Sequence, residues 1–144
     1  MKSRVFLVLL LFFALGLQSI AGIRVMSYNV RQGKADDGEN SWKNRRAATP
    51  AMLNDERPDV FGVQEAYDFQ LKYIHSRCPR YKWVGVGRDD AKSGGEHMSV
   101  FYNTRTIKLI KWGTYYLSET PDVVSKGWDA KYPRTATWAL LEEK

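Results

Sequence analysis

Apolar and polar residues follow one another in short blocks along the chain, which predicts a domain that contains both strands and helices. Residues 23–28 and 59–63 are rich in β-branched and apolar side chains and indicate two strands. Residues 42–57 between them form a helical pattern that Ser41 can cap and that Pro58 ends. Pro50 interrupts this helix, so we expect a kink there or a restart with Thr49 as cap. A crossover of this length predicts that the two strands pair in parallel.

The rest of the chain predicts one further helix and then mainly strands. The helix covers residues 68–76, and the expected strands are 81–86, 98–102, 107–117 and 135–141, with an irregular loop at 118–134. Neither a repeat nor a linker is visible. The predicted fold class is therefore α/β, with a mixed sheet flanked by helices in a single domain.

The first 21 residues have the pattern of a secretory signal peptide. Lys2 and Arg4 precede an almost purely apolar stretch from Val5 to Leu17, and Ser19-Ile20-Ala21 offers a small-residue cleavage site. The apolar stretch is shorter than the roughly 20 residues of a membrane span, although an uncleaved anchor is the alternative. We therefore expect an exported protein, periplasmic or extracellular, whose domain runs from residue 22 to 144.

The net charge and the cysteine content say little about the binding partners and the location of the protein. Removal of Lys2 and Arg4 would lower the formal net charge from +6 to +4. A modest positive excess is compatible with an anionic partner, and equally with an ordinary solvated surface. Cys78 is the only cysteine, so no disulfide can form within the chain, which fits a bacterial periplasm better than animal secretion. A packed or partly exposed thiol is the expected role of Cys78.

Oxygen-bearing side chains follow both of the first two strands. Asn29 ends the first strand, and Gln64 and Glu65 end the second. Because the strands are expected to be parallel, Asn29 and Glu65 should lie at the same edge of the sheet. Mg²⁺ prefers oxygen ligands and usually takes one or two carboxylates from the protein. The pair therefore predicts a divalent-metal site, with Glu65 as ligand; the alternatives are that Glu65 caps the next helix and Asn29 forms a turn.

Three other residues are candidates for contact with a phosphate-bearing substrate. Glu96 follows Gly94-Gly95 at the start of a strand, where a carboxylate can orient a histidine or receive a proton. Arg134 stands between Pro133 and the last strand, and a guanidinium can bind phosphate through two hydrogen bonds; a surface ion pair is the alternative. Trp128 lies in the irregular loop, where its ring can stack on a base or a sugar, although most such aromatics are core residues. His97, on the opposite face from Glu96, is expected to be a surface residue.

Together these segments resemble the endonuclease/exonuclease/phosphatase superfamily, which has the deoxyribonuclease I-like fold. The resemblance rests on Val25-Met26-Ser27-Tyr28-Asn29-Val30-Arg31 and Pro58-Asp59-Val60-Phe61-Gly62-Val63-Gln64-Glu65, with support from residues 95–102 and 133–138. Residues 117–121 and 127–130 resemble an exported bacterial branch. The resemblance implies a four-layer α/β/β/α sandwich, of which this chain would be the N-terminal half.

The same resemblance implies roles for single residues. Glu65 would bind Mg²⁺ or Mn²⁺, Asn29 would line the metal and phosphate site, Arg134 would contact phosphate, and Glu96 would support a catalytic histidine. The family hydrolyses phosphodiesters or phosphomonoesters with a metal-activated water. Its later motifs, an Asn-Thr-His-type strand end, an Asp-x-Asn and a Ser-Asp-His, do not occur after Arg134.

Two readings therefore stay open. One is a metal-dependent phosphoesterase represented by its N-terminal part and inactive by itself; the other is a non-catalytic remnant or a phosphate- or sugar-binding module. In either case half of a sandwich would leave a sheet face uncovered, which favours self-association.

Overall fold

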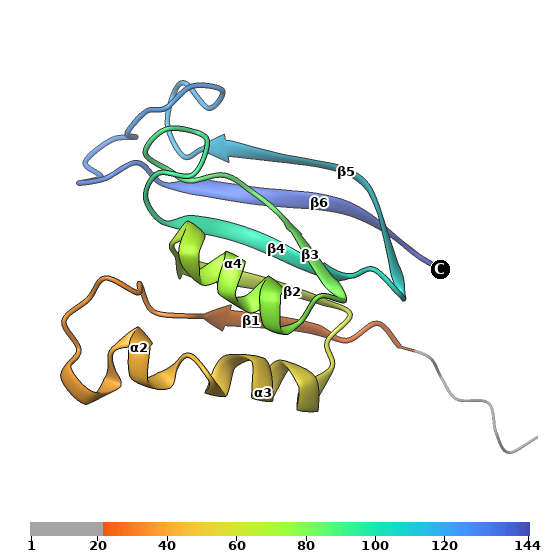
Figure 1. The fold of residues 1–144 in the computed structure, drawn as a ribbon. Helices are drawn as coiled ribbons and strands as arrows, with labels where there is room; N and C mark the ends of the chain where they lie inside the picture. The colour runs from red at the N-terminus through yellow and green to blue at the C-terminus, as the bar shows by residue number, and fades with distance from the viewer. Residues whose placement is uncertain (1–21) are drawn as a thin grey trace, which may run out of the picture.

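The computed structural model describes residues 22–144 (Figure 1). The predicted signal peptide lies outside the described residues. No helix among residues 22–144 has the length and apolar character to cross a membrane. In chain order the elements are β1 (Val25–Asn29), the 3₁₀ turn η1 (Gly38–Asn40), α2 (Trp42–Arg45), α3 (Ala48–Glu56), β2 (Val60–Ala66), α4 (Asp68–Arg77), β3 (Tyr81–Val84), β4 (His97–Asn103), β5 (Ile107–Tyr116) and β6 (Thr135–Glu143).

Four strands form one sheet, in the order β1-β2-β4-β3. β1 and β2 pair in parallel, as the sequence predicted, while β4 is antiparallel to both of its neighbours. β5 and β6 form a separate two-stranded antiparallel sheet. The architecture is thus a mixed α/β fold with flanking helices, which confirms the predicted fold class.

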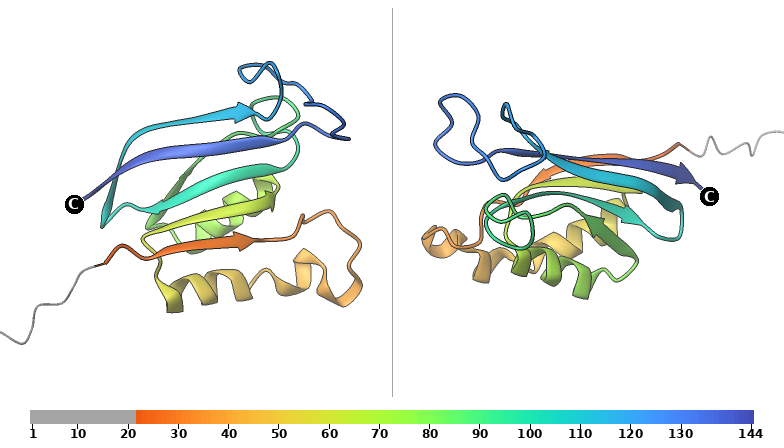
Figure 2. Two further views of the ribbon diagram at one scale, coloured as in Figure 1. Left: turned by 180° about the vertical axis from the view of Figure 1, so that it is seen from behind. Right: turned by 90° about the horizontal axis from the view of Figure 1, so that it is seen from above.

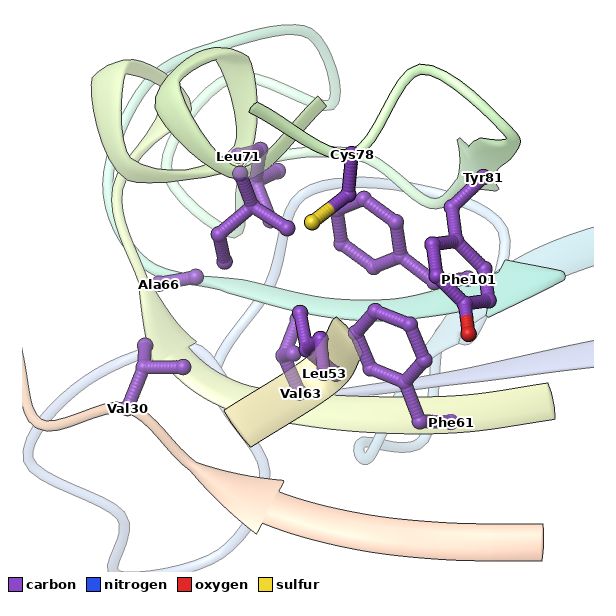
Figure 3. Close-up of a cluster of buried hydrophobic side chains, with 10 residues drawn as sticks. Val30, Leu53, Phe61, Val63, Ala66, Leu71, Cys78, Tyr81 and Phe101 are labelled. Carbon is purple, nitrogen blue, oxygen red and sulfur yellow. The ribbon is translucent and has the colours of Figure 1, made fainter. Parts of the chain in front are cut away.

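The main core lies between the four-stranded sheet and helices α3 and α4 (Figure 3). Phe61 of β2 and Phe101 of β4 stack with ring centroids 4.7 Å apart, and Tyr81 meets Phe61 edge-on at 5.1 Å. The Tyr81 hydroxyl donates to the Pro58 carbonyl over 2.8 Å, so its one buried polar atom is satisfied. Buried aromatic area of this kind stabilises the sheet that carries the candidate residues.

The β5–β6 sheet covers part of the opposite face (Figure 2). A second, smaller core joins Val84, Tyr102 and Ile107 to partly buried residues of β5 and β6. The result is a helix layer, a four-stranded sheet and a two-stranded sheet in succession. Val25 of β1 is 71% exposed and Leu140 of β6 is 55% exposed, so apolar surface remains uncovered on this side.

The helix before β2 breaks two residues earlier than we expected. α2 ends at Arg45 and α3 begins at Ala48, with Ala47 rather than Thr49 at the N-cap. Pro50 does lie in the first turn of α3, where its missing N–H has no intrahelical partner to lose. α3 ends at Glu56, and its C-cap Arg57 adopts a left-handed conformation (φ 47°) just before Pro58.

Candidate functional site

Glu65 owes its position to an irregularity in β2. Val63 pairs with Ser99, and Ala66 pairs with His97, so β2 has one residue more than β4 between these pairs. Glu65 lies in this bulge with a φ of 62°. A bulge turns side chains away from the regular alternation of a strand, and a non-glycine residue in the left-handed region carries strain that is common at functional sites. Glu65 is therefore directed to the strand-end edge of the sheet.

Asn29 lies beside Glu65, because β1 and β2 pair with Asn29 opposite Gln64. Asn29 Nδ2 donates to Glu65 Oε1 over 2.9 Å, and Asn29 Oδ1 accepts from the Arg31 backbone N–H over 2.8 Å. The Gln32 backbone N–H donates to Glu65 Oε2 over 3.3 Å. The loop after β1 thus holds both carboxylate oxygens. Asn29 also forms the turn we considered as its alternative role. α4 begins at Asp68 and its N-cap is Tyr67, so Glu65 does not cap this helix.

Arg31 adds a positive charge to this edge, a contribution that the sequence reading missed. Its guanidinium forms an ion pair with Asp37, with Nη2 2.9 Å from Oδ1. The hydrogen bond and charge of Asp37 raise the pKa of Arg31, and the charges of Glu65 and Glu96 add to this. Arg31 therefore lies within electrostatic reach of both candidate carboxylates. Its φ of 55° is the second left-handed non-glycine conformation at the site.

Glu96 is held by a partner that the sequence did not reveal. Arg88 Nη1 donates to Glu96 Oε2 over 2.7 Å, and the two side chains are only 11% and 15% exposed. The Arg88 backbone N–H donates to the Glu96 carbonyl over 3.1 Å, so the two ends of the 88–96 loop are joined twice. Arg88 also lies over the Tyr132 ring, 5.1 Å from its centroid. Arg88 stands in the polar stretch Gly87-Arg88-Asp89-Asp90, so no sequence pattern pointed to this pair.

Arg134 and Trp128 both lie in or next to the long loop that joins β5 to β6. The Arg134 carbonyl accepts from the Leu117 N–H over 2.8 Å, and its exposed side chain makes no ion pair or hydrogen bond with the residues that the structure describes. Trp128 is 79% exposed and lines a hollow of about 680 Å³ with Tyr115 and Trp138. Asn29 and Glu65 do not line this hollow, so the structure does not bring Trp128 directly to them.

Neither histidine is placed to serve as a general base beside Glu65. His97 is 3% exposed, so our expectation of a surface residue was wrong; the first residue of β4 turns inward against the 88–96 loop. Burial lowers the pKa of His97. His75 Nδ1–H donates to the Tyr81 carbonyl over 2.7 Å, and the ring packs edge-on against Trp83.

The donor set at Glu65 suits a hard cation that keeps most of its waters. No group of three or more His, Cys, Asp or Glu side chains within residues 22–144 forms a closed metal cage. Glu65 offers a carboxylate already oriented by Asn29, which agrees with the preference of Mg²⁺ for one or two protein carboxylates. An amide that hydrogen-bonds to a ligating carboxylate fixes the orientation of that carboxylate toward the metal.

A solved structure identifies the family. A protein from Bacteroides thetaiotaomicron, described as an endonuclease/exonuclease/phosphatase family protein, matches with a TM-score of 0.81 and 40% sequence identity. The match covers 85% of this chain and 44% of the other. The chain belongs to the endonuclease/exonuclease/phosphatase family.

Two further relatives share this fold. A mannosyl-6-phosphatase from Bacteroides thetaiotaomicron matches with a TM-score of 0.81 and 40% identity over 85% of this chain and 46% of its own. A family member from Bacteroides vulgatus matches with a TM-score of 0.80 and 33% identity over 84% and 47%. The chain thus spans less than half the length of these relatives, which agrees with the expected N-terminal half. No protein-family model and no curated protein matches the sequence.

Proposed function

We propose that this chain carries the metal- and phosphate-binding part of a divalent-metal-dependent phosphoesterase. The observation that carries the proposal is the Asn29–Glu65 pair, in which a carboxylate in a strained bulge is oriented by an amide on the neighbouring parallel strand. Membership of a family that includes a phosphatase supports it. A bound Mg²⁺ or Mn²⁺ would polarise a phosphoryl oxygen and lower the pKa of a bound water.

Each candidate residue would have its own role in binding the metal or the substrate. Glu65 would hold the cation, and Asn29 would keep the Glu65 carboxylate in position and line the phosphate site. Arg134 would bind phosphate oxygens, since its guanidinium is exposed and free of other bonds in the described structure. Glu96, fixed by Arg88, would add a negative charge near the site and support a proton-transferring group. Trp128 would contact the organic part of the substrate from the 118–134 loop.

The substrate class that fits is a phosphate ester. One relative is named a mannosyl-6-phosphatase, and the exposed aromatic rings of Trp128 and Trp138 beside the hollow can stack on a sugar ring. We therefore rank phosphorylated sugars ahead of nucleic acid as substrates. The modest positive charge and the lack of a dense run of Lys and Arg agree with this ranking.

We infer that residues 22–144 alone turn over phosphate esters slowly or not at all. Both histidines are engaged in packing, so the described site lacks a residue to take a proton from the attacking water. The test is hydrolysis of mannose 6-phosphate and of bis(p-nitrophenyl) phosphate with and without Mg²⁺. Robust Mg²⁺-dependent turnover by the purified segment would overturn this inference; metal-dependent phosphate binding without turnover supports it and is also what a binding module would show.

Export and self-association complete the proposal. The first 21 residues would direct the protein out of the cytoplasm and be removed after Ala21, which mass spectrometry of the mature protein would reveal.

The exposed apolar residues of β1 and of the β5–β6 sheet, including Val25, Trp138 and Leu140, would drive association of isolated 22–144. Light scattering over a range of protein concentrations tests this, and a strictly monomeric species would contradict it.

A further inference from the structure

A second polar region lies at the other edge of the four-stranded sheet. Asn54 and Arg57 precede β2, Arg77 and Arg80 precede β3, and Arg105 follows β4. Because β4 runs antiparallel to β2, these segments meet at the edge opposite to Asn29 and Glu65. β2 has seven residues, so about 20 Å separates the two edges. The arginines therefore belong to a different site from the one described above.

Two adjoining hollows occupy this edge. One, of about 400 Å³, is lined by Arg77, Arg80 and Arg105, and the other, of about 490 Å³, by Arg57, Arg80 and Arg105. Arg80, Arg105 and Asn54 line both, so the hollows share a wall. No carboxylate lines either of them.

The guanidiniums of Arg57, Arg77, Arg80 and Arg105 have no anionic partner in the described part of the chain. Within residues 22–144 none of them lies in an ion pair, and the carboxylate of nearby Asp59 accepts instead from the Thr106 hydroxyl and the Arg24 N–H. Arg57 Nε donates to the Asn54 carbonyl and Arg80 Nη2 to the Leu53 carbonyl at the end of α3. These bonds use one donor of each, and Arg80 Nε is buried without a partner. Each guanidinium has five N–H groups, so most remain available.

We propose that this edge binds a ligand that carries two neighbouring phosphate groups. Like charges gathered without a counter-charge raise the energy of the free protein, and bidentate bonds from arginine to phosphate oxygens relieve it. Two hollows with a shared arginine wall suit two linked oxyanions better than one. The site is independent of the proposed hydrolytic function, because it uses none of the residues at the Asn29–Glu65 edge.

The test is calorimetric titration of pyrophosphate into the purified protein in metal-free buffer. We expect saturable binding that is tighter than binding of orthophosphate. The double variant Arg77→Gln/Arg105→Gln should bind pyrophosphate at least about tenfold more weakly, since each arginine supplies charge-assisted hydrogen bonds. Neither side chain makes a hydrogen bond or ion pair within residues 22–144, so the variant should fold, which circular dichroism can check.

Two controls separate this site from the other. Lys43→Gln removes an exposed positive charge on α2, away from the hollows, and should change the affinity less than twofold. Glu65→Gln should leave pyrophosphate binding unchanged. Absence of saturable binding, equal affinity in the arginine variant, or loss of binding in Glu65→Gln would each overturn the site. Equal affinities for orthophosphate and pyrophosphate would overturn the assignment of two phosphates.

Discussion

Asn29 Nδ2 lies 2.9 Å from Glu65 Oε1, and this hydrogen bond joins the ends of two parallel strands that are 36 positions apart in the sequence. The bond forms because the register places Asn29 opposite Gln64 while the bulge in β2 turns Glu65 to the edge. The same asparagine fixes the following loop through its bond to the Arg31 N–H. One amide therefore orients both the candidate metal ligand and the backbone beside it.

Loss of the Asn29 amide should weaken metal binding without removing it. Asn29→Ala leaves the Glu65 carboxylate in place but removes the hydrogen bond that orients it. Loss of such a hydrogen bond to a metal ligand typically lowers metal affinity by about 10- to 100-fold. Calorimetry with Mn²⁺ measures the change. Asn40→Ala, which alters an exposed asparagine in η1, is the matched control. An unchanged affinity in Asn29→Ala would show that the pair is structural only.

The Arg88–Glu96 pair should contribute strongly to stability. Both side chains are largely buried, so Arg88→Met leaves a carboxylate without its partner and should lower the free energy of unfolding by about 3 kcal/mol. The double variant Arg88→Met/Glu96→Gln removes the orphaned charge and should recover part of the loss. Urea denaturation of the unsubstituted protein, the single variants Arg88→Met and Glu96→Gln, and the double variant gives the coupling energy. Strict additivity of the two changes would mean that the ion pair does not form.

The free energy of unfolding should fall as the pH drops below 6.5, the ordinary pKa of a histidine side chain. Burial lowers the pKa of His97 from its ordinary value of 6.5, so the unfolded chain binds a proton at a higher pH than the folded chain does. The stabilisation is complete above pH 6.5 and is lost as the pH falls through that value toward the lowered folded-state pKa. Thermal melts between pH 7.5 and 5.5 should therefore show a falling Tm that is flatter in His97→Gln. The same slope in both proteins would rule out His97 as its source.

Gly87 should not tolerate a side chain. A Cβ atom there would overlap the Gly94 carbonyl, a close approach that closes the 88–96 loop and so positions Glu96. Gly87→Ala should lower the free energy of unfolding by about 1–3 kcal/mol, in the range of overpacked sites. Gly22→Ala, where a Cβ would have no neighbour within 4 Å, should be neutral. Equal melting temperatures for the two variants would contradict the close packing of this loop.

The parallel pairing of β1 with β2 and the placement of Asn29 beside Glu65 were predictable because they depend on local patterns. Apolar runs followed by polar strand ends, with a crossover between them, require parallel pairing and bring those ends together. The bulge at Glu65 was not predictable, because it depends on the register between β2 and β4 and not on the β2 sequence itself.

Contacts between side chains that lie far apart in the sequence were also not predictable. The Arg88–Glu96 pair and the inward orientation of His97 both follow from closure of the 88–96 loop, which glycine spacing indicates but does not specify. The helix break at residues 46–47 differs from the expected break at Thr49 and Pro50, because a proline is accepted within the first helical turn and therefore does not mark where the helix begins. The arginine edge was not predictable, because its members come from three separate segments of the chain.

Paramagnetic NMR with Mn²⁺ tests the central claim most directly, since the bound ion broadens the signals of nearby amides. The proposed site predicts saturable broadening centred on residues 29–32 and 64–66, abolished by the isosteric change Glu65→Gln and retained in Asp36→Asn, which alters an exposed carboxylate in the loop after β1. Broadening centred elsewhere, or unchanged broadening in Glu65→Gln, would contradict a metal site at Glu65.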